Sequence, residues 1–313
     1  MFGKDTNYFF KSRIFFVILQ KKKNSNKKHN TTQAMITFPC AKINLGLNIV
    51  AKRDDGYHDL ETVFYPVPLF DALEILPMDD QFPSATGCDL KVSGNIVDCD
   101  EEKNLVVRAY KLLSQEFRLP RIHAHLYKHI PMQAGLGGGS SDGAFMIRLL
   151  DEKFQLNLGN AQMERYAAQL GADCAFFITA EPAFATGIGD KLVPADGPHG
   201  NLHGYTIAIV KPDIAVSTRE AYAAITPRKP AKSCRDIVRQ PISTWPCELV
   251  NDFEAPIFAV HPRLAQIKQR LYDLGALYAQ MSGSGSALFG IFNQEPADLA
   301  RQFPDDFTFT ARL

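Results

Sequence analysis

The stretch MQAGLGGGSSDGA, Met132 to Ala144, constrains this chain more than any other segment. It concentrates glycine around two adjacent serines, Ser140 and Ser141. Glycine loses more backbone freedom on folding than any other residue, so a glycine-rich segment beside an apolar helix pattern needs a reason. A predicted strand, Ile122 to Ile130, precedes the loop, and a predicted helix, about Ser141 to Phe154, follows it. The first N–H groups of such a helix lack partners and lie at its positive end, so the segment predicts a phosphate-binding loop.

Two other phosphate loops do not fit. The pattern G-x-x-x-x-G-K-[ST] needs a lysine after its last glycine, and none follows here. The dinucleotide pattern G-x-G-x-x-G is nearly met by Gly135, Gly137 and Ser140, but it requires an acid at the end of the next strand. Asp151 and Glu152 instead fall within the predicted helix. A turn that only connects two elements would not need so many glycines beside paired serines.

Composition indicates a globular protein of two domains, since the chain has 313 residues, of which 46% are hydrophobic and 22% charged. No apolar run reaches the ~18 residues of a membrane span, and we expect no membrane partner. The six cysteines include no C-x-x-C pair, so zinc is not expected. We expect reduced thiols in a cytoplasmic protein.

Charge is divided unevenly along the chain. Residues 1–34 carry eight Lys or Arg and one acid, a net of +7, and the remainder carries 26 basic and 33 acidic residues, a net of −7. A body this acidic argues against nucleic acid as a partner. The basic tail has no periodicity and is predicted to be disordered. It fits a targeting segment, a nucleic-acid or membrane-surface arm, or no function at all. We favour the last, with the working protein starting at Met35, where a complete first strand begins.

The periodicity of the rest predicts mixed strands and helices, the α+β class, without regular βαβ units. Asn104 is placed to cap the helix that follows it. Residues 183–203 are rich in Gly, Pro and Asp, a composition that predicts turns. An apolar strand is expected after Asp173. The strand that begins at Tyr205 is expected to open a second domain. Predicted strands are Ile36–Val50, Leu60–Val67, Leu73–Leu76, Asp89–Val97, Ile122–Ile130, Tyr205–Val210, Ala276–Met281 and Ala287–Phe292, and predicted helices are Asn104–Leu113, Ser141–Phe154, Met163–Leu170 and Arg263–Leu274.

Several blocks resemble a known family, the GHMP kinases. The segment PMQAGLGGGSSDGA resembles the phosphate loop of that family. Four further segments closely resemble one member of the family: FPCAKINLGLNI, RDDGYHDLETVF, LGADCAFF and MSGSGSALF. That member phosphorylates the 2-hydroxyl of a cytidine-diphosphate-linked methylerythritol. The resemblance implies a ribosomal S5 domain 2-like N-terminal domain and a ferredoxin-like C-terminal domain. With the basic tail at 1–34, the expected domains are 35–186 for ATP binding and 187–313 for the C-terminal part.

The resemblance also implies the reacting pair. It makes Asp173 the aspartate that takes the proton of the substrate hydroxyl, with Lys42 beside it. A lysine ammonium would keep such an aspartate ionised and help lower the pKa of the hydroxyl. The alternative is a buried structural ion pair or two unrelated charges.

Six further residues are implied to hold the substrate. Asn44 lies on the same strand face as Lys42. His58 would bond the edge of the cytosine and Tyr57 would stack on its face, with an aromatic residue closing the other side. The six residues are Asn44, Tyr57, His58, Phe64, Thr218 and Tyr222.

ATP is the implied phosphoryl donor. Asn104 and Lys128 match residues near adenine and ribose, and magnesium is expected to bind through the ATP phosphates, near Ser140 or Ser141. Cys174 and Ala175 depart from the family, in which a proline is common after the residue that follows the aspartate. The implied ATP-binding residues are Pro131, Met132, Gly135, Leu136, Gly137, Gly138, Gly139, Ser140, Ser141, Asn104 and Lys128.

Three rival functions remain open at this stage. The chain could be a homoserine or mevalonate type of small-alcohol kinase, but only a nucleotide-linked substrate needs the Tyr57–His58 pair. It could be a binding protein that kept the fold without catalysis, against which the intact Lys42, Asp173 and glycine loop argue. It could be an adaptor acting through its basic tail. We expect a small-molecule substrate, and a homodimer stays open.

Overall fold

The computed structural model describes residues 33–79, 81–82, 86–95, 100–195 and 202–313, without the side chains of Thr218 and Glu220. The predicted basic tail therefore lies outside the described part, except for its last two residues. Ala34–Leu313 forms one compact unit. Among the described residues, no helix combines the length and the apolar character that a membrane span requires.

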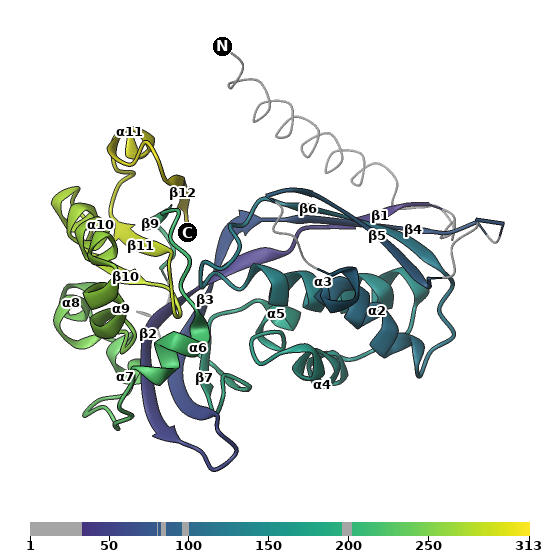
Figure 1. The fold of residues 1–313 in the computed structure, drawn as a ribbon, viewed down its shortest axis with the longest axis horizontal. Coiled ribbons are helices and arrows are strands. Elements are labelled where there is room, and N and C mark those ends of the chain that lie inside the picture. The colour runs from purple at the N-terminus through teal and green to yellow at the C-terminus, as the bar shows by residue number, and fades with distance from the viewer. Residues whose placement is uncertain (1–32, 80, 83–85, 96–99, 196–201) are drawn as a thin grey trace. The chain divides into compact units, whose positions relative to one another are not determined.

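The first sheet has the order β1-β4-β6-β5, and α2 and α3 cover one of its faces (Figure 1). Alternation along β6 produces this arrangement, because Ile122, Ala124 and Leu126 are buried while His125 points to solvent. Asn104 caps α2 as predicted, since its side chain accepts a hydrogen bond from the N–H of Val106 at 3.0 Å. The elements are β1 Met35–Thr37, β4 Ala72–Pro77, β5 Cys88–Gly94, β6 Ile122–Lys128, α2 Leu105–Ser114 and α3 Gly138–Phe154.

The second sheet has the order β2-β3-β7-β8 and is antiparallel. Strand β2 is buried over its first ten residues, so both of its faces are covered. The segment 183–203 contains the predicted turn, at residues 187–190, and also two strands, β7 and β8, that were not predicted. Strand β7 pairs with β3, with Ala185 opposite Thr62, and β8 pairs with β7; the contact with β3 is long-range and leaves no local signal in this glycine-rich segment. The elements are β2 Cys40–Lys52, β3 His58–Phe70, β7 Ala183–Thr186 and β8 Lys191–Pro194.

The third sheet has the order β10-β11-β9-β12, with α10 packed against it (Figure 1). Strand β12 was not predicted, although its sequence FTFTAR alternates and pairs along β9. The boundary near residue 186 between the two expected domains stays a prediction. The elements are β9 Thr206–Lys211, β10 Tyr278–Met281, β11 Leu288–Phe292, β12 Phe307–Arg312, α6 Thr218–Ala223, α7 Cys234–Ile237, α8 Trp245–Glu248, α9 Glu254–Val260, α10 Pro262–Asp273 and α11 Leu299–Gln302, with 3₁₀ turns at Glu101–Lys103 and Ile242–Thr244.

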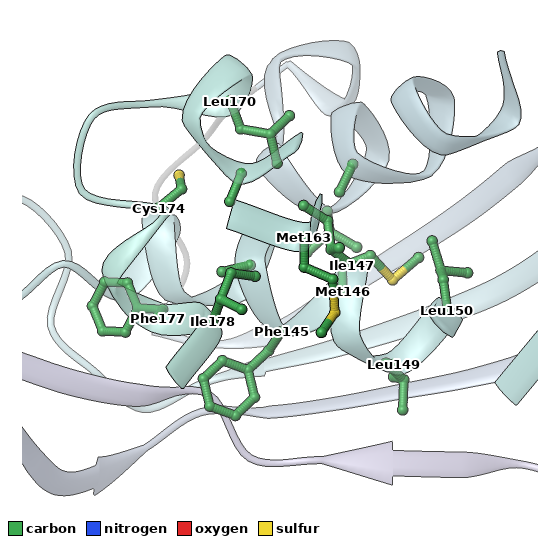
Figure 2. Close-up of a cluster of buried hydrophobic side chains, with 14 of the residues drawn as sticks. Phe145, Met146, Ile147, Leu149, Leu150, Met163, Leu170, Cys174, Phe177 and Ile178 are labelled. Atoms are coloured by element: carbon green, nitrogen blue, oxygen red, sulfur yellow. The ribbon is translucent and has the colours of Figure 1, made fainter. Parts of the chain in front are cut away.

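Helices α3, α4 (Asn160–Leu170) and α5 (Phe176–Thr179) enclose an apolar cluster (Figure 2). The strand predicted after Asp173 was wrong, because this segment is the short helix α5. Its aromatic residues favour a strand by propensity, but Phe176 and Phe177 are buried in the cluster, and tertiary packing overrides propensity. Helix α5 therefore fixes the turn that carries Asp173.

Candidate active site

Strand β2 carries two polar side chains into an apolar wall. Lys42 and Asn44 are two residues apart and share a face of the strand. Lys42 is 3% exposed, its Nζ donates to Asn44 Oδ1 at 2.6 Å, and Asn44 Nδ2 donates to Thr62 Oγ1 at 3.1 Å. Burying a charge in this way is unfavourable unless a counter-charge is near. A carboxylate should therefore face Lys42.

Asp173 supplies that carboxylate from the turn between α4 and α5. Its Oδ2 lies 3.5 Å from Lys42 Nζ, and its side chain is 34% exposed, so one oxygen faces the lysine while the group remains accessible. Burial lowers the pKa of the Lys42 ammonium below its usual value, and the charge of Asp173 offsets this only in part. The structure thus brings the predicted pair together.

A cleft of about 1140 Å³ opens over this pair. It contains all of the predicted substrate residues whose side chains are described. Its lining also includes Lys52, Arg219 and the turn Gly283–Gly285. The predicted residues in the lining are Lys42, Asn44, Tyr57, His58, Phe64, Asp173 and Tyr222.

Aromatic rings form one wall of the cleft. His58 and Tyr222 stack with ring centroids 5.0 Å apart and planes 28° apart, and Phe253 meets Tyr222 edge-on at 4.9 Å. Tyr57 is 62% exposed at the rim. Burial, and then the charge of Asp173, raises the pKa of Tyr222 to about 12, so its hydroxyl stays protonated. The side chain of Thr218 lies outside the described residues.

A second cavity, of about 570 Å³, lies over the glycine loop. Helix α3 begins at Gly138, three residues earlier than predicted, and Gly137 precedes it without a side-chain cap, so its first N–H groups stay available to a ligand. Gly135 and Gly137 line both cavities, which therefore meet at the loop. The predicted residues in the lining are Asn104, Lys128, Pro131, Met132, Gly135, Leu136, Gly137, Gly138, Gly139 and Ser140. Ser141 is buried within α3 instead.

Lys128 is held by two carboxylates that were not predicted. Its Nζ donates to Asp142 Oδ2 at 2.6 Å and to Asp71, and Asp71 also accepts from the backbone N–H groups of His129 and Ile130. Burial lowers the pKa of Lys128, but the charges of Asp142 and Asp71 outweigh it and the pKa is raised. Asp142 directly follows the paired serines, which could have drawn attention to it, whereas Asp71 has no signal in the sequence.

Strand β2 and the segment after β10 both donate hydrogen bonds to backbone carbonyl groups of the glycine loop. Lys42 N–H donates to Leu136 O at 2.9 Å, and Ala287 N–H donates to Ala134 O at 3.1 Å. Ser282 Oγ donates to Gly135 O at 2.9 Å. Strand β2, the loop and the turn after β10 therefore hold one another in register where the two cavities join.

A glycine loop at a helix start beside a lysine–aspartate pair and a separate cleft is the arrangement of a small-molecule kinase. The family model for the GHMP kinases N terminal domain matches residues 104–181, and that for the GHMP kinases C terminal domain matches residues 242–307.

Curated relatives are similar over nearly the whole chain. A Bacteroides fragilis protein named 4-diphosphocytidyl-2-C-methyl-D-erythritol kinase is 53% identical over 89% of this chain and all of its own length. A Parabacteroides distasonis protein of the same name is 47% identical over the same shares. A solved 4-(cytidine 5'-diphospho)-2C-methyl-D-erythritol kinase has a TM-score of 0.73 at 30% identity, over 88% of this chain and 98% of its own. The chain belongs to the GHMP kinases, and among them to the family of 4-diphosphocytidyl-2-C-methyl-D-erythritol kinases.

The predicted α+β class and the two-part GHMP kinase fold are thereby confirmed. The homoserine kinase from Cytophaga hutchinsonii shares the fold, with a TM-score of 0.63 over 92% of this chain and 96% of its own, but only 14% of the sequence. That likeness concerns the fold alone.

Proposed function

We propose that the protein transfers the γ-phosphoryl group of ATP to the 2-hydroxyl of 4-diphosphocytidyl-2-C-methyl-D-erythritol. The products are the 2-phosphate and ADP, in isoprenoid precursor biosynthesis by the methylerythritol phosphate pathway. The observation that carries this proposal is the Lys42–Asp173 pair, which lies in a cleft walled by stacked aromatic rings and open to the glycine loop. The names of the curated relatives support the choice of substrate.

In this proposal Asp173 accepts the proton of the 2-hydroxyl as the oxygen attacks the γ-phosphorus and ADP leaves. Lys42 remains protonated, offsets the negative charge that develops and is oriented by Asn44. The N–H groups at the start of α3 hold the ATP phosphates.

The aromatic wall selects the cytidine end in the same proposal. Stacking of a base on Tyr57 or Tyr222 is worth about 1–3 kcal/mol and is available to any nucleotide, so hydrogen bonds from His58 to the base edge provide selectivity. The substrate's diphosphate is an anion, and Lys52 and Arg219 line the cleft that would hold it. Homoserine and mevalonate offer no base to this wall.

Magnesium is part of the proposal as the partner of the ATP phosphates. Mg²⁺ prefers oxygen ligands and keeps several waters. Ser140 supplies a hydroxyl group in the cavity over the glycine loop, which we call the nucleotide cavity. Asp142 Oδ1 and Ser141 Oγ are buried beside it without a hydrogen-bond partner. When bound, the ion would neutralise the charge on the β- and γ-phosphates.

We further propose that the enzyme works in the cytoplasm, because the five cysteines within the described ranges are free thiols, as expected in a reducing compartment. A homodimer stays a prediction.

The test of the proposed function is ADP release with purified protein, ATP and magnesium. We expect turnover with the cytidine substrate and none with homoserine or mevalonate. Turnover with either of these alcohols instead would contradict the proposal.

A further inference from the structure

Four consecutive residues, Asn251 to Glu254, form a short segment that runs from the loop after α8 to the first residue of α9 and that the proposed chemistry does not use. We refer to it as the NDFE segment. The side chains of Asn251, Asp252 and Phe253 each contact a different part of the cleft. Such a concentration of contacts in one turn indicates that the segment fixes the cleft's walls relative to one another.

Asn251 holds the turn after β10. It is 3% exposed, and its Nδ2 donates to both Met281 O and Gly283 O at 2.8 Å. Its Oδ1 accepts from the N–H of Phe253 at 3.0 Å, so both Nδ2 donors and the acceptor of the amide are used. A buried group satisfied in this way specifies one position for the turn.

The other side of that turn packs directly on the glycine loop. A Cβ at Gly283 would lie 3.3 Å from Gly135 Cα, and a Cβ at Gly135 would lie 2.8 Å from the carbonyl carbon of Ser282. Ser282 Oγ is also 3.5 Å from Asn44 Oδ1. The turn is therefore wedged between Asn251 and the point where the two cavities meet, so a displacement at Asn251 would be transmitted to Gly135.

Asp252 connects the segment to β2. Its Oδ2 accepts from the N–H of Ile49 at 2.8 Å, and its own N–H donates to Leu47 O at 2.9 Å. Strand β2 also carries Lys42 and Asn44. The segment thus has a fixed reference on the strand that bears the reacting lysine.

Phe253 supports the aromatic wall. It is 1% exposed and meets Tyr222 edge-on, with the planes at 81°. Tyr222 in turn stacks on His58. Phe253 therefore supports the aromatic wall, whereas Asn251 holds the turn that packs on the glycine loop.

We propose that Asn251 is a positioning residue for phosphoryl transfer, and that Phe253 is a positioning residue for substrate binding. Asn251 acts through the Met281–Ser286 turn on the glycine loop, and Phe253 acts through Tyr222. The role proposed for Phe253 rests on the proposed cytidine substrate. Substitutions at the two neighbouring positions should accordingly affect different kinetic constants.

Asn251→Asp keeps the volume but replaces the donor with a carboxylate oxygen that faces two carbonyl groups. We expect kcat to fall about 100-fold, the effect of a displacement of roughly 1 Å in a reacting geometry, while KM for the cytidine substrate changes less than about threefold. Phe253→Leu should give the opposite result, with KM raised about tenfold and kcat nearly unchanged. Asn160→Asp, the same change at an exposed position in α4, is the matched control and should alter neither constant.

Gly283→Ala displaces the same turn from its other side and should reproduce the fall in kcat. This variant therefore tests the inference if the Asn251→Asp protein does not fold. A folded Asn251→Asp protein with wild-type kcat would overturn the inference. So would equal changes in kcat and KM in both variants, or failure of both turn variants to fold, each of which indicates a purely structural role. Wild-type turnover of the cytidine substrate is measured first, so that failure of the proposed function is recognised separately.

Discussion

Gly135→Ala should disrupt the contact between the glycine loop and the turn after β10. Gly135 has φ of 73°, which costs an L-residue roughly 1–2 kcal/mol. The new Cβ would lie 2.8 Å from the carbonyl carbon of Ser282 and closer still to its oxygen. Since carbon atoms pack at about 3.5–4.0 Å, one backbone has to move by roughly 0.7–1.2 Å.

Overpacking of this kind typically costs about 1–3 kcal/mol, so the free energy of unfolding should fall by about 2–5 kcal/mol in total. At about 2–4 °C per kcal/mol, Tm falls by at least about 4 °C, which thermal unfolding followed by circular dichroism measures. ATP binding, measured by calorimetry with a non-hydrolysable analogue, should weaken as well.

Gly139→Ala is the matched control in the same loop. No atom lies within 4 Å of its Cβ position, and alanine favours the helix by about 1 kcal/mol over glycine. Stability should therefore stay the same or rise, while the methyl group occupies the nucleotide cavity and weakens ATP binding. Equal stability of the Gly135→Ala and Gly139→Ala proteins would refute the reasoning.

Further predictions concern the cleft and the tail. His58→Ala should raise KM for the cytidine substrate by about 5- to 150-fold, because a base edge left without its hydrogen-bond partner costs about 1–3 kcal/mol, and leave KM for ATP unchanged; a shift in KM for ATP instead would place His58 elsewhere. Because burial lowers the pKa of Lys42 in the free protein, kcat/KM should fall on the alkaline side at a pH below 10.5, and Lys42→Arg should move that fall to higher pH. Because the pKa of Lys42 is lower in the folded chain than in the unfolded chain, the unfolded chain binds more protons at pH values between the folded-state pKa and 10.5. The free energy of unfolding should therefore rise with pH in that window, and a flat profile would contradict the prediction. Removing residues 1–34 should leave kcat and both KM values unchanged, and a loss of activity would show that the basic tail belongs to the working enzyme.

Local patterns in the sequence predicted much of the fold. Helices α2 and α10 were predicted from their apolar periodicity, to within one residue at each end. The start of α3 was predicted three residues late, because glycine propensity argues against a helix where Gly138 and Gly139 form its first turn. Strands β7 and β12 escaped prediction because their pairing with β3 and β9 is long-range.

The residues of the candidate site were likewise predicted only in part. Lys42 and Asp173 were singled out by resemblance, and the structure places them 3.5 Å apart. Asp71 and Asn251 could not be found, because each acts on a segment far from it along the chain and the sequence does not show which carbonyl or ammonium it will meet. Such contacts follow from the packing of the three sheets rather than from local pattern.

The most direct test of the account is ADP release with ATP, magnesium and 4-diphosphocytidyl-2-C-methyl-D-erythritol, comparing the wild-type chain with Asp173→Asn. A general base contributes about 10²- to 10⁴-fold, so kcat should fall by that factor while KM for the cytidine substrate and Tm change little. An Asp173→Asn protein that retains more than about a tenth of the wild-type kcat would contradict the assignment of Asp173 as the base.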